Sequence, residues 1–232
     1  MNKQRSELNK VMQAQIKKKS EFKNGINTLL ELRGYMMEEI KGFKNKLCLE
    51  EYSAIPYINS KGYESKTVAY SLWHIFRIED IVANTLIRGG EQVFFSGNYQ
   101  NRTASPIITT GNELVKEEIA EFSAKLNIDG LYSYIEEVKK STELLLSDLT
   151  YDDVKRKMTD SDKARLLELN VVSTDENAFW LVDYWCGKSI EGLIRMPFSR
   201  HWMMHIDACG RIINRINKLP RGKSKRTDRL YP

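Results

Sequence analysis

Hydrophobic residues recur every three or four positions over most of this chain, the spacing that places them on one face of an α-helix. This pattern covers residues 26–43 and continues less regularly upstream, which predicts one long first helix with an irregular start. A loop is expected around residues 54–62. Residues 67–87 (TVAYSLWHIFRIEDIVANTLI) are apolar on nearly every helical face and should form a helix buried at the centre of the protein.

The next segment interrupts the helical pattern. Gly89 and Gly90 should end the buried helix, and residues 89–110 mix β-branched, aromatic and turn residues without a period. We expect an insertion here that forms a loop or a short extended excursion. Thr110 with Glu113 matches a capping box, which predicts that a short helix starts there, with Leu114, Val115, Ile119 and Phe122 facing inward.

The second half of the chain predicts more helices. Asp129 should cap a helix whose apolar stripe runs to Leu149. A short helix is expected near residues 164–169, and Ser173 with Glu176 is a second capping-box candidate. The last helix should cover residues 198–219, with Pro197 either at its first turn or at a kink in a longer helix that began near Ser189.

This succession of helices without convincing strands predicts an all-α protein. The simplest architecture is a four-helix bundle with additional short helices and one irregular insertion. No linker-like stretch divides the 232 residues, so we expect a single domain over 1–232, with the bundle core at about 26–219 and a basic tail at 220–232.

Charge and cysteine content narrow the functional classes. The formal net charge is +5, but residues 221–232 hold five basic residues and one acidic residue, so the tail carries +4 of it. No aromatic residues alternate with these charges, which makes nucleic-acid binding the least favoured function. Three cysteines without a paired spacing and no run of eighteen apolar residues predict a cytoplasmic protein with no membrane span.

Three histidines are the candidate chemistry. The chain contains only His74, His201 and His205, and the last two are four residues apart in the final predicted helix. Residues at this spacing lie about 5–6 Å apart at Cβ and can chelate one ion. Three neutral imidazoles would leave an open coordination position on zinc, nickel, iron or copper. The alternative is that these are ordinary core histidines. If Pro197 marks a helix start, the helix dipole would favour the neutral, ligating form of His201.

Two further interpretations are excluded. The histidine pair is not the HExxH motif of zinc proteases, because Trp202 stands where the general-base glutamate would be. Cys209 shares the stripe, but it lies roughly 12 Å along the helix axis from His201, too far to bind the same ion. We interpret Cys209 as a buried core thiol.

Charged residues near His74 allow two interpretations. Arg77 either pairs with Asp80 or a carboxylate on a facing helix, or it faces a pocket and binds an anionic group of a substrate. Glu79 differs from His74 by about 140° around the helix, which argues against direct cooperation. The four tryptophans, Trp73, Trp180, Trp185 and Trp202, are expected in the core or a pocket wall. No catalytic base is assigned. The predicted substrate pocket comprises Trp73, Arg77 and Trp202.

The two histidine segments resemble the DinB-like (DinB/YfiT) superfamily of four-helix bundles. The similarity rests on LWHIFRIEDI at 72–81 and HWMMH at 201–205, and it extends loosely over residues 26–219. It implies that His74, His201 and His205 are metal ligands. The chain departs from the frequent form of the last motif, in which a second histidine and a Gly-Gln pair follow; here His205 is followed by IDACGR at 206–211.

The resemblance implies a divalent metal, with zinc or nickel ahead of iron, and two kinds of activity. Similar proteins include thiol transferases that use a low-molecular-weight thiol and proteins described as metal-dependent hydrolases. We therefore expect a metalloenzyme acting on a small electrophilic substrate. The alternative is a non-catalytic, stress-related module that binds metal or ligand. The apolar residues at 93–95 fit either a lid or a contact in a homodimer.

Overall fold

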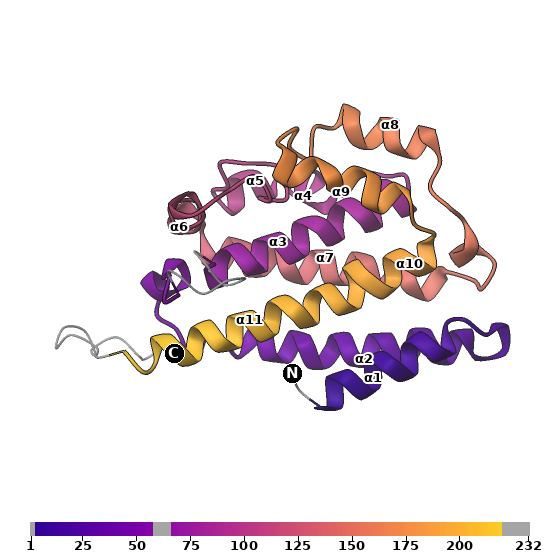
Figure 1. Ribbon diagram of the computed structural model, residues 1–232, viewed down its shortest axis with the longest axis horizontal. Helices are drawn as coiled ribbons and strands as arrows, with labels where there is room; N and C mark the ends of the chain where they lie inside the picture. The colour runs from indigo at the N-terminus through magenta and orange to yellow at the C-terminus, as the bar shows by residue number, and fades with distance from the viewer. Residues whose placement is uncertain (1–2, 58–65, 220–232) are drawn as a thin grey trace.

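The computed structural model describes residues 3–57 and 66–219, and its regular structure there is helical apart from one isolated β-bridge between Lys157 and Ser189. The predicted all-α class is confirmed. Long helices lie side by side in the body of the molecule, and α8 and α9 lie along its upper side in Figure 1. None of the helices in these ranges is long and apolar enough to cross a membrane. The basic tail lies outside the described residues.

The first predicted helix is in fact two helices. α1 (Lys3–Gln15) is followed by a 3-10 turn (Lys19–Glu21), and α2 (Phe22–Lys41) then packs back against α1. At the reversal, a Cβ atom on Gly25 would lie only 2.6 Å from Cγ2 of Ile16, so the close approach requires glycine. The expectation of one helix with an irregular start was wrong because the apolar spacing continues on both sides of the turn.

A 3-10 helix (Leu49–Ser53) follows α2, and the chain is irregular over residues 54–57. The rest of the predicted 54–62 loop lies outside the described residues. α3 (Val68–Asp80) then begins at Thr67, whose side chain accepts a hydrogen bond from the backbone N–H of Tyr70 (3.0 Å). A π-helical segment (Ile81–Ile87) continues it, and every residue of both is buried, as predicted. Gly89, at φ +69°, follows the helix end.

The insertion after Gly89 contains two helical turns, α4 (Val93–Ser96) and α5 (Tyr99–Arg102), where a loop or extended excursion was predicted. Phe94 is fully buried, while Val93 and Phe95 are partly buried against the core. The sequence of the insertion lacks a helical period because its aromatic and β-branched residues pack the insertion onto the body of the protein.

The predicted caps before α6 and α7 were misplaced. The N-cap residue of α6 (Glu117–Lys125) is Lys116, not Thr110. The Thr110 hydroxyl instead donates a hydrogen bond to the side chain of Asn112 (2.8 Å). Val115, which was expected to face inward, is 46% exposed. α7 (Ile128–Asp148) is capped by Asn127, not by Asp129. The predicted stripe of α7 is nevertheless buried: Leu131, Tyr134, Ile135, Val138 and Leu145.

The C-terminal third contains a 3-10 turn (Asp153–Lys155), α8 (Asp160–Glu168) and α9 (Glu176–Cys186). α8 confirms the short helix expected near residues 164–169. The N-cap residue of α9 is Asp175 rather than Ser173. Trp185 is buried in the core, but Trp180 is 51% exposed, so its predicted place in the core or a pocket wall was wrong.

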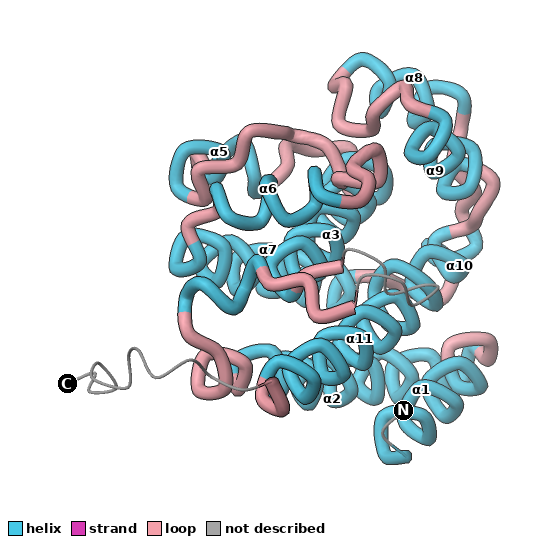
Figure 2. The backbone as a smooth tube through the Cα atoms, turned by 60° about the vertical axis from the view of Figure 1, so that its left-hand side comes forward, coloured by secondary structure: helices cyan, strands magenta, loops and turns pink. Residues whose placement is uncertain are grey.

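The histidine pair lies on a long interrupted helix. α10 (Ile190–Arg195), capped by Ser189, passes through a π-helical segment (Met196–Arg200) into α11 (His201–Ile216) without a break. Pro197 therefore sits within a continuous helix, the second of the two predicted alternatives. Figure 2 shows α10 and α11 as one path that runs beside α2 and α3.

Candidate metal centre

The three histidines of the chain meet between α3 and α11. His74 projects from α3, and His201 and His205 project from α11, where the two helices pack together. One ring nitrogen from each histidine takes part, and these three nitrogens all lie within 4.8 Å of one another. The ring centroids are 4.5 Å apart for the α11 pair, and His74 is 5.0 Å from His201 and 4.8 Å from His205. Three donor atoms therefore converge on one small volume.

The orientation of His74 is set by the end of the insertion. Its Nδ1 lies 3.0 Å from the carbonyl oxygen of Thr110. A carbonyl can only accept, so Nδ1 carries the proton and donates, and the lone pair of the neutral ring is on Nε2. The Tyr70 ring stacks on the imidazole at 5.6 Å and 15°, and its hydroxyl donates to the Gly111 carbonyl (3.1 Å). Adjacent backbone carbonyls thus fix both rings.

His201 and His205 carry the observation that tests whether the site fits a metal. The Nδ1 atoms of both are buried without a hydrogen-bond partner in the described part of the chain. Leaving a polar atom in this state costs about 1–3 kcal/mol, and most buried polar groups in proteins are paired. Buried, unpaired imidazole nitrogens beside a third, oriented imidazole are a suitable donor set for a divalent transition metal.

Burial keeps all three rings neutral. It lowers the pKa of His74 from its ordinary 6.5 to about 4, against a smaller raising effect of the hydrogen bond to Thr110. Burial also puts the pKa of His201 and of His205 well below 6.5, and neighbouring histidines lower both further. The neutral ring is the form that ligates metal. The dipole of a helix N-terminus is not needed for this, since His201 lies well inside a continuous helix.

The residues predicted to line a substrate pocket are fully buried in the core. Trp73 packs against the rings of Phe94, Phe122 and Tyr134. Trp202 packs against Phe76 at a centroid distance of 4.6 Å. The contacts of these two indoles are those of core residues.

Arg77 pairs with Asp80, which is the structural one of the two interpretations predicted for it. Its Nη1 lies 3.4 Å from Asp80 and 3.1 Å from the hydroxyl of Tyr134. Nη2 donates to Gln92 (3.0 Å) and to the Ile108 carbonyl (2.6 Å), which also accepts from Nε (3.2 Å). All five N–H groups face acceptors of the protein, which leaves none for a substrate.

Glu79 is also committed elsewhere. Its two oxygens accept from the guanidinium of Arg33 at 2.7 and 3.0 Å, and Oε2 accepts from the indole N–H of Trp202 at 2.7 Å. Arg33 stacks over the Trp202 ring at 4.3 Å and donates to the Phe198 carbonyl (3.1 Å). This network joins α2, α3 and α11 beside the histidines. Sequence spacing gave no sign of Arg33 as the partner, because the two residues lie on different helices.

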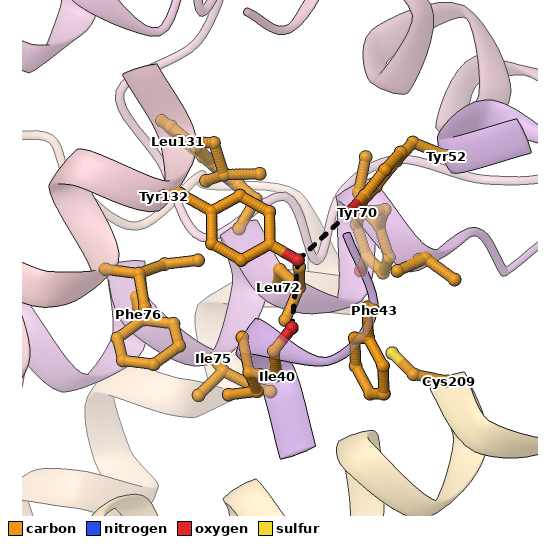
Figure 3. Close-up of a cluster of buried hydrophobic side chains, with 14 of the residues drawn as sticks. Ile40, Phe43, Tyr52, Tyr70, Leu72, Ile75, Phe76, Leu131, Tyr132 and Cys209 are labelled. Atoms are coloured by element: carbon orange, nitrogen blue, oxygen red, sulfur yellow. Dashed lines mark hydrogen bonds between the residues drawn. The ribbon is translucent and has the colours of Figure 1, made fainter. Parts of the chain in front are cut away.

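Cys209 is a core thiol, as predicted. It lies outside the histidine group and belongs to the hydrophobic cluster drawn in Figure 3, in which the Tyr132 hydroxyl is hydrogen-bonded to the Tyr52 hydroxyl and to the Ile40 carbonyl. Burial raises the pKa of the thiol to about 12. The thiol is thus a neutral member of the core.

A surface groove lies away from the histidines, between α2 and α7. Apolar residues (Leu30, Met37 and Leu144) line it together with charged side chains of both signs, and none of the three histidines borders it. The histidine site between α3 and α11 is therefore separate from this groove.

Comparisons with known protein families, with curated proteins and with solved structures gave no match. The similarity to the DinB-like superfamily therefore rests on the residues alone and remains a prediction.

Proposed function

We propose that this protein is a divalent-metal-binding helical bundle of the DinB-like type in which His74, His201 and His205 hold the ion, zinc or nickel ahead of iron. The observation that supports this most directly is the meeting of three neutral imidazoles, with His74 and His201 buried and His205 partly buried, in which the Nδ1 atoms of His201 and His205 are unpaired. In a protein without a metal role, these nitrogens would be expected to have hydrogen-bond partners.

The proposed activity is transfer or hydrolysis at a small electrophilic substrate, with a low-molecular-weight thiol or water as nucleophile. A divalent ion held by uncharged ligands keeps its full charge and lowers the pKa of a thiol or water, which supplies a nucleophile at neutral pH. The protein's own contribution is to keep the imidazoles unprotonated by burial and to orient His74 through Thr110. The ligand set is thereby prepared before the ion arrives.

A second candidate is a binding module without turnover. One observation favours it: the acidic residues of α3, Glu79 and Asp80, are occupied by buried hydrogen bonds and cannot act as a general base for the site. Such a protein would bind the same ion through the same histidines. The two candidates therefore differ in catalysis and agree in metal content.

Metal analysis tests the shared part of both candidates. We expect about one zinc or nickel ion per chain in protein purified without chelators, and a loss of at least tenfold in His201→Ala and in His205→Ala. Cys209→Ala is the matched control on the same helix, since that thiol lies outside the histidine group, and it should retain the ion. Unchanged metal content in both histidine variants would refute the site.

Turnover separates the candidates. The metal-loaded protein is mixed with 1-chloro-2,4-dinitrobenzene plus cysteine or glutathione, and separately with 4-nitrophenyl acetate, and product is followed by absorbance. Product formation that disappears in His205→Ala supports the enzyme. A protein that binds one ion and gives no product in either assay supports the binding module.

A further inference from the structure

The insertion between α3 and α6 ends on a proposed metal ligand. It leaves α3 after Gly89, passes through α4 and α5, and returns so that the carbonyl of Thr110 meets the Nδ1–H of His74. Backbone carbonyls in irregular segments have no secondary structure to hold them in place. The position of this carbonyl must therefore be fixed by side-chain contacts of the insertion.

Arg77 holds the insertion just before Thr110, while the Tyr70 hydroxyl holds the Gly111 carbonyl just after it. Two of its N–H groups, on Nε and Nη2, converge on the carbonyl of Ile108, two residues before Thr110, and Nη2 also reaches Gln92 near the start of α4. The planar fork of a guanidinium has the geometry for several fixed acceptors at once, which an ammonium group does not. One side chain thus holds both ends of the insertion.

Asp80 fixes the start of the insertion. Its carboxylate accepts hydrogen bonds from the backbone N–H groups of Val93 and Phe94, both at 2.9 Å, at the N-terminus of α4. It also accepts from Asn84 (2.7 Å) and from the Tyr134 hydroxyl (2.8 Å). The carboxylate is fully buried, and its oxygens are occupied by these donors and by Arg77.

The three residues are evenly spaced on α3. His74, Arg77 and Asp80 follow one another at intervals of three, so each is a neighbour of the next on the helix surface. Each holds a different point of the insertion, at Thr110, Ile108 and Val93 respectively. Burying a charged pair is costly, and apolar replacement of such pairs often stabilises proteins, so overall stability alone gives a weak reason for this arrangement.

We infer that Arg77 and Asp80 are positioning residues of the histidine site, which clamp the insertion in the one placement where the carbonyl of Thr110 orients His74 for ligation. The inference rests on the proposed function for its effect on metal affinity. The clamp also determines which ring nitrogen of His74 carries the proton, and this effect does not depend on any metal. Arg77 acts on His74 through the insertion, and it donates its hydrogen bonds to the insertion, Asp80 and Tyr134.

The experiment compares Arg77→Lys with wild type in two measurements. In metal-free protein, two-bond ¹H–¹⁵N NMR spectra report which ring nitrogen of His74 carries the proton. With Zn²⁺ alone as the probe, competition with a chromophoric chelator gives the dissociation constant. Arg156→Lys is the control, because Arg156 likewise holds two carbonyls, those of Leu86 and Ile87, at the far end of the π-helical segment.

We expect wild type and Arg156→Lys to keep the proton on Nδ1 of His74 and to bind Zn²⁺ within about twofold of each other. Arg77→Lys should lose the single Nδ1–H form and bind Zn²⁺ about 10–100-fold more weakly, the usual cost of removing an outer contact of a metal ligand. A folded Arg77→Lys with the wild-type tautomer and affinity would overturn the inference.

A second variant covers the case in which Arg77→Lys does not fold. Val93 is the first residue of α4 and donates its N–H to Asp80, while Gln92 before it has an extended backbone (φ −72°, ψ 143°). Proline suits such a position; it deletes the N–H and puts a small apolar ring in place of the partly buried valine side chain. Val93→Pro should weaken Zn²⁺ binding at least threefold, and an unchanged affinity would overturn the inference. If wild type binds no Zn²⁺, the proposed function fails and the tautomer of His74 decides the inference alone.

Discussion

Acid should destabilise the metal-free protein through its buried imidazoles. Burial lowers the pKa of His74 to about 4 and places those of His201 and His205 well below their ordinary value of 6.5. At pH values between the folded-state and unfolded-state pKa values, these histidines are protonated in the unfolded chain and neutral in the folded protein. The stability is therefore complete above about pH 6.5 and is lost as the pH falls toward the folded-state values.

The expected size follows from His74, which is only 6% exposed. A fall in its pKa from 6.5 to about 4 corresponds to about 3 kcal/mol of unfolding free energy, at roughly 1.4 kcal/mol per unit. His201 and His205 act in the same direction, and each proton contributes at most about 1.4 kcal/mol per pH unit. Three histidines can thus reduce stability by up to about 4 kcal/mol per pH unit at the steepest point.

Urea unfolding with a chelator present, at pH values between 7 and 4.5, measures this loss. The matched variant is His74→Asn, whose side-chain amide can still donate to the Thr110 carbonyl but cannot titrate. Acidic groups that also respond over this range contribute equally to both proteins and cancel in the difference. We expect a shallower decline for His74→Asn. Parallel curves for the two proteins would refute the burial argument for this histidine.

Three other outcomes can be measured by unfolding. Zn²⁺ at about 100 times its dissociation constant should stabilise the protein by about 2.7 kcal/mol, seen as a rise in Tm, and an unchanged Tm would contradict specific binding. Trp202→Phe removes the indole N–H that donates a hydrogen bond to Glu79, and it should lower the free energy of unfolding in urea by about 1.5–3 kcal/mol. A decrease of less than about 0.5 kcal/mol would show that this hydrogen bond is dispensable. Gly25→Ala puts a methyl group 2.6 Å from Ile16 and should cost about 1–3 kcal/mol, while Gly34→Ala, whose Cβ meets nothing within 4 Å, should not destabilise; equal stabilities would contradict the predicted clash.

The residues of the candidate site could be predicted from the sequence, because their signal is local. The spacing of His201 and His205 on a helix determines that they point the same way, and the apolar surroundings of His74 predict its burial. The groups that support the site had no such signal. A backbone carbonyl such as that of Thr110 looks the same at every position, and the pairing of Arg33 with Glu79 depends on which helices become neighbours.

Helix boundaries were less predictable than helices. Several residues able to cap a helix occur together, as with Asn127 beside Asp129 and Ser173 beside Asp175, and the packing of the whole helix selects among them. The reversal between α1 and α2 was missed for a related reason. Helical periodicity reflects which residues are buried, and residues on both sides of this turn are buried in one hydrophobic cluster.

The π-helical segment from Met196 to Arg200 limits how the C-terminal region can change length. A π-helical turn amounts to one residue inserted into an α-helix and absorbed locally, so the helix after it keeps its phase, whereas one residue added to or removed from regular α-helix rotates everything after it by about 100°. Deleting Ser199 should therefore restore regular helix and leave His201 and His205 facing His74. Chains that keep the three-histidine site should tolerate a single-residue deletion in this segment far better than a deletion between His201 and His205.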